Sequence, residues 1–342
     1  MLRPIALLAA VTVALAVLAC GDKAEPTPPE KTAGPIPQLN PPQAAEPVPG
    51  PLVESAPKGM VVDVGARPEG IAIDPESHTV GVAVTDPPRL VLLDSRSGKK
   101  LREVRLPSSA RHVALSAPGE SFLVPCEDAD RLVEVPLDGS DPIETEVGDN
   151  PHDATAIGPR RFVINEFDST MDVVRDAEVV GSTPTDAQPG GVANVGGLVY
   201  VNAVRAYTVE PYTNADEPRA LGGQSSGLGT SHVVVGPDAK LALGDTRGQA
   251  LVVYQTDPRL KFLNRIPLGG TPVGLAWDGK DTMWVTLSEQ NEAVPVDLSG
   301  EKPVVGDPVA STQTPLSMAV DSATGRLAIA GADDGKVVLV DP

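Results

Sequence analysis

The chain has 342 residues, and its 46 Asp and Glu against 27 Lys and Arg give a formal net charge of -19 at pH 7. A surface this acidic repels phosphate backbones, so we expect no nucleic-acid binding. Aromatic residues make up only 3% of the chain, which argues against a stacking groove for sugars or bases.

Residues 1–19 have the pattern of an export signal. Arg3 is followed by an apolar run from Ile5 to Leu18, which is too short to span a bilayer comfortably. The run ends at Ala19-Cys20-Gly21, which resembles the bacterial lipobox, where the cysteine is acylated. We predict a lipoprotein signal peptide with lipidation at Cys20; an ordinary secretory signal with an incidental cysteine is the alternative.

Acyl chains on Cys20 would hold the protein at a membrane without a transmembrane helix. The expected location is therefore the cell envelope, lipid-anchored and extracytoplasmic. Gly21, rather than Asp, follows the cysteine, so the usual inner-membrane retention signal is missing. This favours the outer membrane, its periplasmic side or the cell surface.

Residues 20–58 are predicted to form the lipidated cysteine and a disordered linker. Eleven of the 38 residues that follow Cys20 are proline, and no periodic apolar pattern accompanies them. At ~3.1 Å per residue, such a spacer reaches roughly 100 Å from the membrane.

The second cysteine of the chain is Cys126, at the end of the apolar run Phe122–Val124. If Cys20 is acylated, Cys126 has no partner, and we expect a packed thiol rather than a disulfide.

Residues 59–342 contain a repeat of short strands separated by Gly, Asp, Asn and Pro. Each repeat begins with a turn and an apolar strand, and the seven anchors start at Pro68, Ala110, Pro151, Pro189, Thr230, Pro272 and Pro315. The successive spacings are 42, 41, 38, 41, 42 and 43 residues. A period near 40 with four strands per unit predicts an all-β fold, a seven-bladed β-propeller of four-stranded blades.

The ends of this domain predict how the ring closes. The last repeat stops after its third strand, Lys336–Val340, and an unassigned strand at about residues 60–64 precedes the first anchor. We predict that this N-terminal strand completes the last blade, since closure removes an open sheet edge.

The repeats resemble those of the YVTN/YncE-like propellers, and more loosely those of NHL and gluconolactonase-like propellers. The resemblance rests on the segments Pro68–Pro75 and Pro272–Asp278, and on Met283–Thr286 followed by Asn291. It implies the propeller architecture and leaves function open.

Loops before the first strands and turns between the second and third strands emerge on one face of a propeller, which we call the top face. The candidate binding residues at the tunnel mouth on this face are Glu69, Arg111, His112, His152, Asp153, Glu166, His232 and Asp245. Three of them, His112, His152 and His232, occupy equivalent or adjacent repeat positions, and convergent imidazoles with a carboxylate would suit Zn²⁺, Cu²⁺ or Fe²⁺. The alternative is that polar residues gather here only to satisfy the backbone groups of loop ends.

Two functional hypotheses follow. The leading one is a non-enzymatic, membrane-anchored scaffold that binds a protein or a small ligand on its top face. The alternative is a metal-dependent hydrolase or lactonase at the tunnel mouth. We assign no catalytic residue and no cofactor beyond the hypothetical divalent metal ion, and we expect a monomer.

Overall fold

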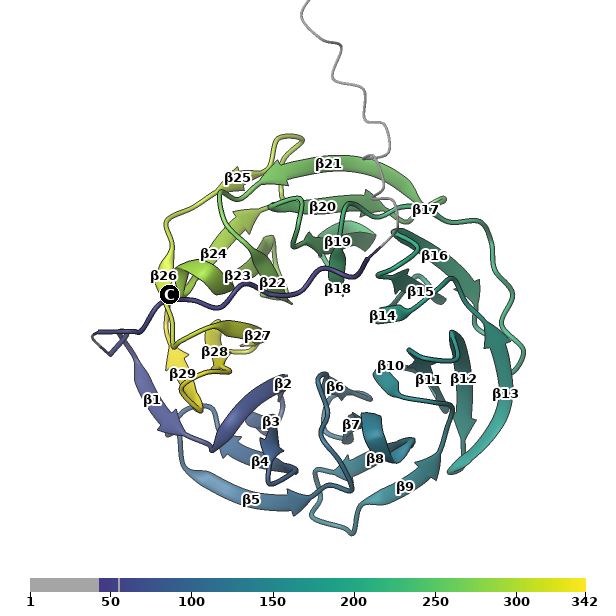
Figure 1. Ribbon diagram of the computed structural model, residues 1–342, viewed down its shortest axis with the longest axis horizontal. Helices are drawn as coiled ribbons and strands as arrows, with labels where there is room; N and C mark the ends of the chain where they lie inside the picture. Colours follow the sequence, from purple (N-terminus) through teal and green to yellow (C-terminus); the bar gives the residue numbers. More distant parts are fainter. Residues whose placement is uncertain (1–42, 55) are drawn as a thin grey trace, which may run out of the picture. The chain divides into compact units, whose positions relative to one another are not determined.

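A computed structural model of the protein describes residues 43–54 and 56–342. The predicted signal peptide, Cys20 and the first part of the predicted linker lie outside the described residues. The described chain is all-β, and seven antiparallel sheets surround a central axis (Figure 1). In the described part, no helix is long and apolar enough to cross a membrane.

Each blade begins near one of the predicted anchors. Blade 1 consists of β2 (Ala66–Asp74), β3 (Thr79–Asp86), β4 (Arg89–Asp94) and β5 (Lys100–Arg105). Blade 2 consists of β6 (Ala114–Leu115), β7 (Ser121–Cys126), β8 (Arg131–Pro136) and β9 (Ile143–Glu146). Blade 3 consists of β10 (Pro151–Ile157), β11 (Arg160–Asn165), β12 (Thr170–Arg175) and β13 (Glu178–Pro184). Blade 4 consists of β14 (Pro189–Val195), β15 (Leu198–Ala203), β16 (Thr208–Thr213) and β17 (Gln224–Ser225).

The remaining blades follow the same order. Blade 5 consists of β18 (Thr230–Val235), β19 (Lys240–Asp245), β20 (Ala250–Gln255) and β21 (Lys261–Pro267). Blade 6 consists of β22 (Pro272–Trp277), β23 (Thr282–Leu287), β24 (Glu292–Asp297), β25 (Val304–Val305) and β26 (Val309–Ala310). Blade 7 consists of β27 (Pro315–Asp321), β28 (Arg326–Gly331), β29 (Lys336–Val340) and β1 (Met60–Asp63). Three short 3-10 helices are η1 (Glu127–Ala129), η2 (Pro237–Ala239) and η3 (Ser288–Gln290).

The ring closes as predicted, by pairing the first strand of the domain with the last. β1 runs antiparallel to β29, with Met60 opposite Leu339 and Asp63 opposite Lys336. The N-terminal strand thus supplies the outermost position of blade 7 and covers an edge that would otherwise be unpaired.

Packing between blades forms the core. The ring of Phe122 on β7 is fully buried against Gly81 on β3, where an added Cβ would lie only 3.0 Å from that ring. Trp284 packs in a cluster with Met318 and Ile329, which joins blades 6 and 7. Cys126 is fully buried in the core, and burial raises the pKa of its thiol to about 12, as expected of a packed and unreactive side chain.

A repeated backbone hydrogen bond organises the top face. In blades 2 to 7, the residue after the second strand donates its N–H to the carbonyl just before the anchor, at 2.8–3.1 Å. Examples are Glu127 to Ser109, Glu166 to Asn150 and Thr246 to Gly229. This bond holds the two kinds of loop of each blade side by side at the tunnel mouth.

Candidate functional site

The three predicted histidines meet at the tunnel mouth. His112 precedes β6, His152 is the second residue of β10, and His232 is the third residue of β18. The ring centroid of His112 lies 4.9 Å from that of His152 and 4.6 Å from that of His232. Their equivalent or adjacent places in the repeat explain why three different blades bring imidazoles to one point.

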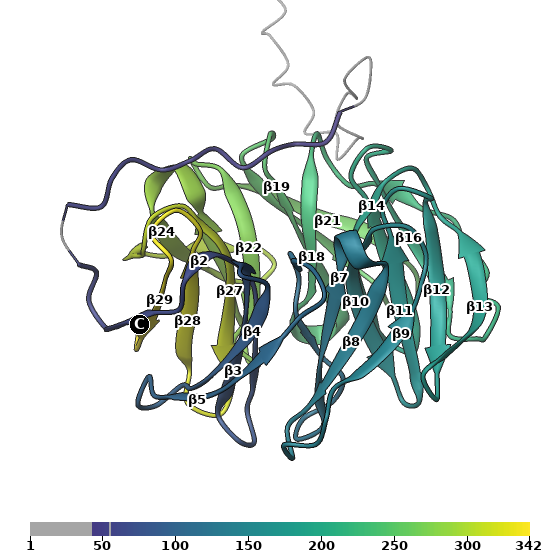
Figure 2. The same cartoon turned by 60° about the horizontal axis from the view of Figure 1, so that its bottom comes forward.

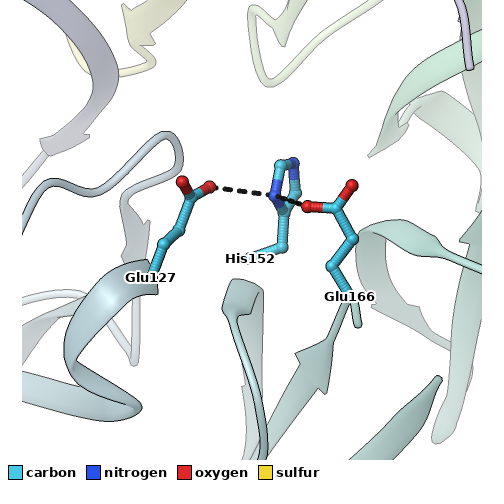
Figure 3. A group of neighbouring side chains, drawn as sticks. All are labelled: Glu127, His152 and Glu166. Carbon is cyan, nitrogen blue, oxygen red and sulfur yellow. Dashed lines mark ion pairs between the residues drawn. The ribbon is translucent and has the colours of Figure 1, made fainter. Parts of the chain in front are cut away.

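The tightest group of charged side chains centres on His152 (Figure 3). Its Nδ1 lies 3.0 Å from Glu127 Oε1 and 3.1 Å from Glu166 Oε2. Glu127 and Glu166 each directly follow the second strand of their blade, and the Gln188 amide donates a hydrogen bond to the other oxygen of Glu166. Within residues 43–54 and 56–342, this is the one group of three such side chains whose ligand atoms all lie within 4.8 Å of one another.

The surroundings of the three histidines give them different pKa values. Burial lowers the pKa of His152, but the carboxylates of Glu127 and Glu166 outweigh burial and raise this pKa to about 9. Burial and then the His152 charge lower the pKa of His232 to about 4. Burial, together with His232, His152 and Arg111, holds the pKa of His112 well below its usual value. At neutral pH, one charged imidazole therefore faces two neutral ones.

Glu69 and Arg111 lie at the same mouth. Arg111 Nε is 3.8 Å from Glu69 Oε2 and 3.5 Å from Glu127 Oε1. The guanidinium thus bridges carboxylates from blades 1 and 2. Burial raises the pKa of Glu166, but His152, the hydrogen bond from Gln188 and, to a smaller extent, the charge of Arg111 outweigh burial and keep this pKa below its usual value.

Two predicted carboxylates bond mainly to the backbone framework, although Asp153 Oδ2 also lies 3.7 Å from His112 Nδ1. Asp153 accepts backbone hydrogen bonds from Ala154 at 2.8 Å and from Val192 at 2.9 Å, which ties blade 3 to blade 4. Asp245 is fully buried and accepts backbone hydrogen bonds from Leu228 at 3.1 Å and Gly248 at 3.0 Å. Backbone N–H groups therefore bind both oxygens of Asp153 but only Oδ1 of Asp245, whose Oδ2 has no hydrogen-bond partner among the described residues.

A small cavity of about 110 Å³ opens at the mouth. Its polar lining comprises Glu46, Glu69, Arg111, His112, His152, Glu166, Gln188, Ser231 and His232. A second cavity of about 260 Å³ shares Arg111, His112 and His232 and continues along the inner strands past Asp153 and Thr155. The histidine cluster therefore separates a shallow upper space from a deeper one in the tunnel.

Residues 43–54, which fall in the predicted linker, cross the top face (Figure 2). Ala44, Ala45, Glu46 and Pro47 line the upper cavity. This contact was not predicted, because the composition of the segment indicates only an extended, unpaired chain.

Protein side chains hold this segment mainly by its backbone. Arg247 Nη2 donates to the Ala44 carbonyl at 2.7 Å, Ser288 Oγ to the Val48 carbonyl at 2.8 Å, and Asn291 Nδ2 to the Pro51 carbonyl at 2.8 Å. Further bonds join Tyr207 to Gln43 and the N–H of Gly50 to Thr314 Oγ1. The contacts come from blades 4 to 7, so a band of polar side chains runs across this half of the face.

The candidate residues chosen from the sequence do not include Glu127, although the sequence carries a signal for it. Glu127 follows β7 just as Glu166 follows β11, so the two glutamates occupy the same position of the repeat. Their convergence on one imidazole nitrogen depends on the angle between neighbouring blades, which the repeat alone does not specify.

Comparison with known proteins supports the architecture. No protein-family model matches the chain, and no curated protein matches its sequence. Solved structures do match. The chain is a seven-bladed β-propeller.

Three of these structures illustrate the likeness. A chain of hydrazine synthase from Kuenenia stuttgartiensis has a TM-score of 0.71 at 17% identity, over 84% of this chain and 99% of that one. A chain of a mitotic checkpoint complex gives 0.71 at 13% identity, over 88% and 96%. The β-propeller domain of Cps50 (Swd1) from Myceliophteria thermophila gives 0.69 at 10% identity, over 80% and 96%. At these identities the likeness shows the fold alone.

Proposed function

We propose that the protein is a lipid-anchored, extracytoplasmic lipoprotein of the YVTN/YncE-like type whose top face binds extended polypeptide. The anchor and the location rest on the pattern of residues 1–20, and the family on the repeat motifs. The binding activity rests on the propeller scaffold and on the contacts of its top face.

One observation carries the peptide-binding proposal: the top face already holds an extended segment of this chain. Side chains of Arg247, Ser288 and Asn291 donate to backbone carbonyls of that segment, and such bonds are available in any extended peptide. Proline adds stiffness, so a Pro-rich partner loses little conformational entropy on binding. The preferred ligand is therefore an extended, proline-containing segment of another protein.

The chain's own segment acts as a tethered competitor. A short flexible linker gives an effective concentration of ~1 mM, so a segment with an intrinsic Kd of ~10 µM would weaken the binding of a partner about 100-fold. A partner peptide thus has to displace residues 43–54 before it occupies the face.

The test uses the full-length protein in mild detergent and a full-length variant whose residues 43–54 are replaced by a Gly/Ser sequence of equal length. A fluorescent peptide with the sequence of residues 43–54 is titrated into both, and anisotropy is measured. We expect the peptide to bind the Gly/Ser variant and to bind the wild type about 100-fold more weakly.

Further substitutions in the Gly/Ser variant locate the binding surface. Arg247→Ala and Asn291→Ala should each weaken peptide binding, whereas Lys99→Ala is the control, because Lys99 is an exposed cation in the turn between β4 and β5. Equal affinity for the wild type and the Gly/Ser variant, or no binding to either, would contradict the proposal.

A metal-dependent hydrolase or lactonase remains the second proposal. It is favoured by the imidazole and carboxylates beside the cavity of about 110 Å³ at the tunnel mouth. Hydrolysis of lactones and esters that requires Zn²⁺ or Mn²⁺, stops with chelator and is lost in His152→Gln would support it. Absence of turnover across such a screen would reject it.

A further inference from the structure

Two buried polar atoms at the tunnel mouth have no hydrogen-bond partner among the residues that the structure describes. They are His152 Nδ1 and Glu127 Oε1, and each of these residues is only 8% exposed. The two atoms form an ion pair at 3.0 Å without the geometry of a hydrogen bond, and a second ion-pairing oxygen, at 3.1 Å from Nδ1, belongs to Glu166. Buried polar atoms without partners are uncommon, since each costs free energy.

The spacing of these atoms is that of ligands around a shared ion. Neighbouring donors on an ion with ~2.1 Å bonds lie roughly 2.9–3.4 Å apart at angles between octahedral and tetrahedral values. The two carboxylate oxygens lie on either side of the imidazole nitrogen (Figure 3) and within 4.8 Å of each other. The two distances between Nδ1 and these oxygens, 3.0 and 3.1 Å, fall within that range.

We infer that Glu127, His152 and Glu166 form a binding site for one divalent transition metal ion. The ion takes the place of the proton on His152 Nδ1 and is bonded by one imidazole nitrogen and two carboxylate oxygens. This donor set suits Zn²⁺ or Mn²⁺ better than Mg²⁺ or Ca²⁺, which prefer oxygen ligands alone. Ion binding here requires no catalytic step and no peptide on the top face.

This ligand set differs from the histidine triplet predicted from the sequence. His112 and His232 pack against each other at 4.6 Å between ring centroids, and neither belongs to the group of ligand atoms around Nδ1 of His152. Glu127, supplied by η1, and Glu166, supplied by the loop after β11, take their places.

A protein cation stands next to the proposed ion. Arg111 Nε lies 3.5 Å from the same Glu127 oxygen, so its charge competes with a metal ion for that carboxylate. Removing this charge should therefore strengthen ion binding. His152 and Glu166 also line the upper cavity, which gives the ion a route from the top face.

The inference is tested by isothermal titration calorimetry on the full-length protein in mild detergent, without a histidine tag and after dialysis against chelator. ZnCl₂, MnCl₂, MgCl₂ and CaCl₂ are titrated separately at pH 7.5. We expect one Zn²⁺ per chain at this site, bound more tightly than Mn²⁺, with Mg²⁺ and Ca²⁺ weaker than both. Failure to bind Zn²⁺, or tighter binding of Ca²⁺ than of Zn²⁺, would overturn the inference.

Variants identify the ligands, and thermal melting checks that each variant is folded. His152→Gln and Glu166→Gln should each weaken Zn²⁺ binding roughly 10-fold or more. His78→Asn, in the turn between β2 and β3 and outside the lining of both cavities, is the control and should change the affinity by no more than about twofold. His232→Asn separates this ligand set from the histidine triplet and should weaken binding much less than His152→Gln. Arg111→Gln should tighten binding. Unchanged affinity in His152→Gln, or a loss in His232→Asn as large as in His152→Gln, would overturn the proposed ligand set.

Discussion

The low pKa of His232 makes a quantitative prediction about acid stability. Burial and the His152 charge lower this pKa from 6.5 to about 4 in the folded protein. As the pH falls from 6.5 to 4, the unfolded chain takes up a proton on His232 before the folded chain does, so folding stability is lost. The pKa difference of 2.5 (6.5 minus 4), at ~1.4 kcal/mol per pKa unit, amounts to about 3.5 kcal/mol once the pH is well below 4.

The perturbation that isolates this effect is His232→Asn. Urea unfolding at pH 7.5 and at pH 4.5 is followed by the fluorescence of Trp277 and Trp284 in the wild type and the variant. Asp153 has the opposite effect on stability, because burial raises its pKa to about 6 and its protonation therefore favours the folded state as the pH falls. The change in the free energy of unfolding of the wild type alone therefore does not isolate the effect of His232. The informative quantity is the difference between the two proteins: acidification to pH 4.5 should cost the variant less free energy of unfolding than the wild type, by up to about 2.5 kcal/mol.

Equal losses in the wild type and in His232→Asn would refute this reasoning. An NMR titration of ¹³C-labelled histidine provides an independent check, since the chain has four histidines and single variants assign their signals. The signal of His232 should titrate near pH 4, and that of His152 in the metal-free protein near pH 9. A midpoint for His232 between pH 6 and 7 would show that it is not desolvated as described.

Two further predictions concern the core. Phe122→Ala should lower the free energy of unfolding by about 3–5 kcal/mol, because it leaves a cavity where the fully buried ring packs against Gly81. In the same urea experiment, the control Phe167→Ala should change the free energy of unfolding by less than about 0.5 kcal/mol, because Phe167 is 68% exposed. Cys126 should resist iodoacetamide in the folded protein at pH 8 and react after unfolding, because burial raises its pKa to about 12. Mass spectrometry of the peptide that contains Cys126 measures the alkylation. Rapid alkylation of Cys126 in the folded protein would contradict the prediction.

The fold was predictable because its determinants are local and repeated. Anchors such as Pro151, Pro189 and Pro272 start inner strands at the predicted residues, and the missing strand of the last blade pointed to ring closure. The second blade departs most: its first strand is only Ala114–Leu115, although the anchor begins at Ala110. There the chain around His112 forms the tunnel mouth in place of a longer strand.

The site was predictable only in part. Equivalent or adjacent repeat positions were enough to predict that the three histidines lie together, but the partners of His152 depend on distances between blades. The contacts of residues 43–54 were beyond prediction for a different reason. These hydrogen bonds are made largely to backbone carbonyls, which every residue has, so the composition of the segment cannot predict them.

Ring closure by β1 also determines how the domain responds to mechanical load. A pull from the N-terminal side travels along the chain through residues 43–54 before it reaches Met60–Asp63, the strand that completes blade 7. The hydrogen bonds of Arg247, Ser288 and Asn291 with that segment therefore bear the load first. Moderate tension would peel the segment from the top face while the pairing of β1 with β29 stays intact, so pulling would uncover the tunnel mouth before it opened the ring.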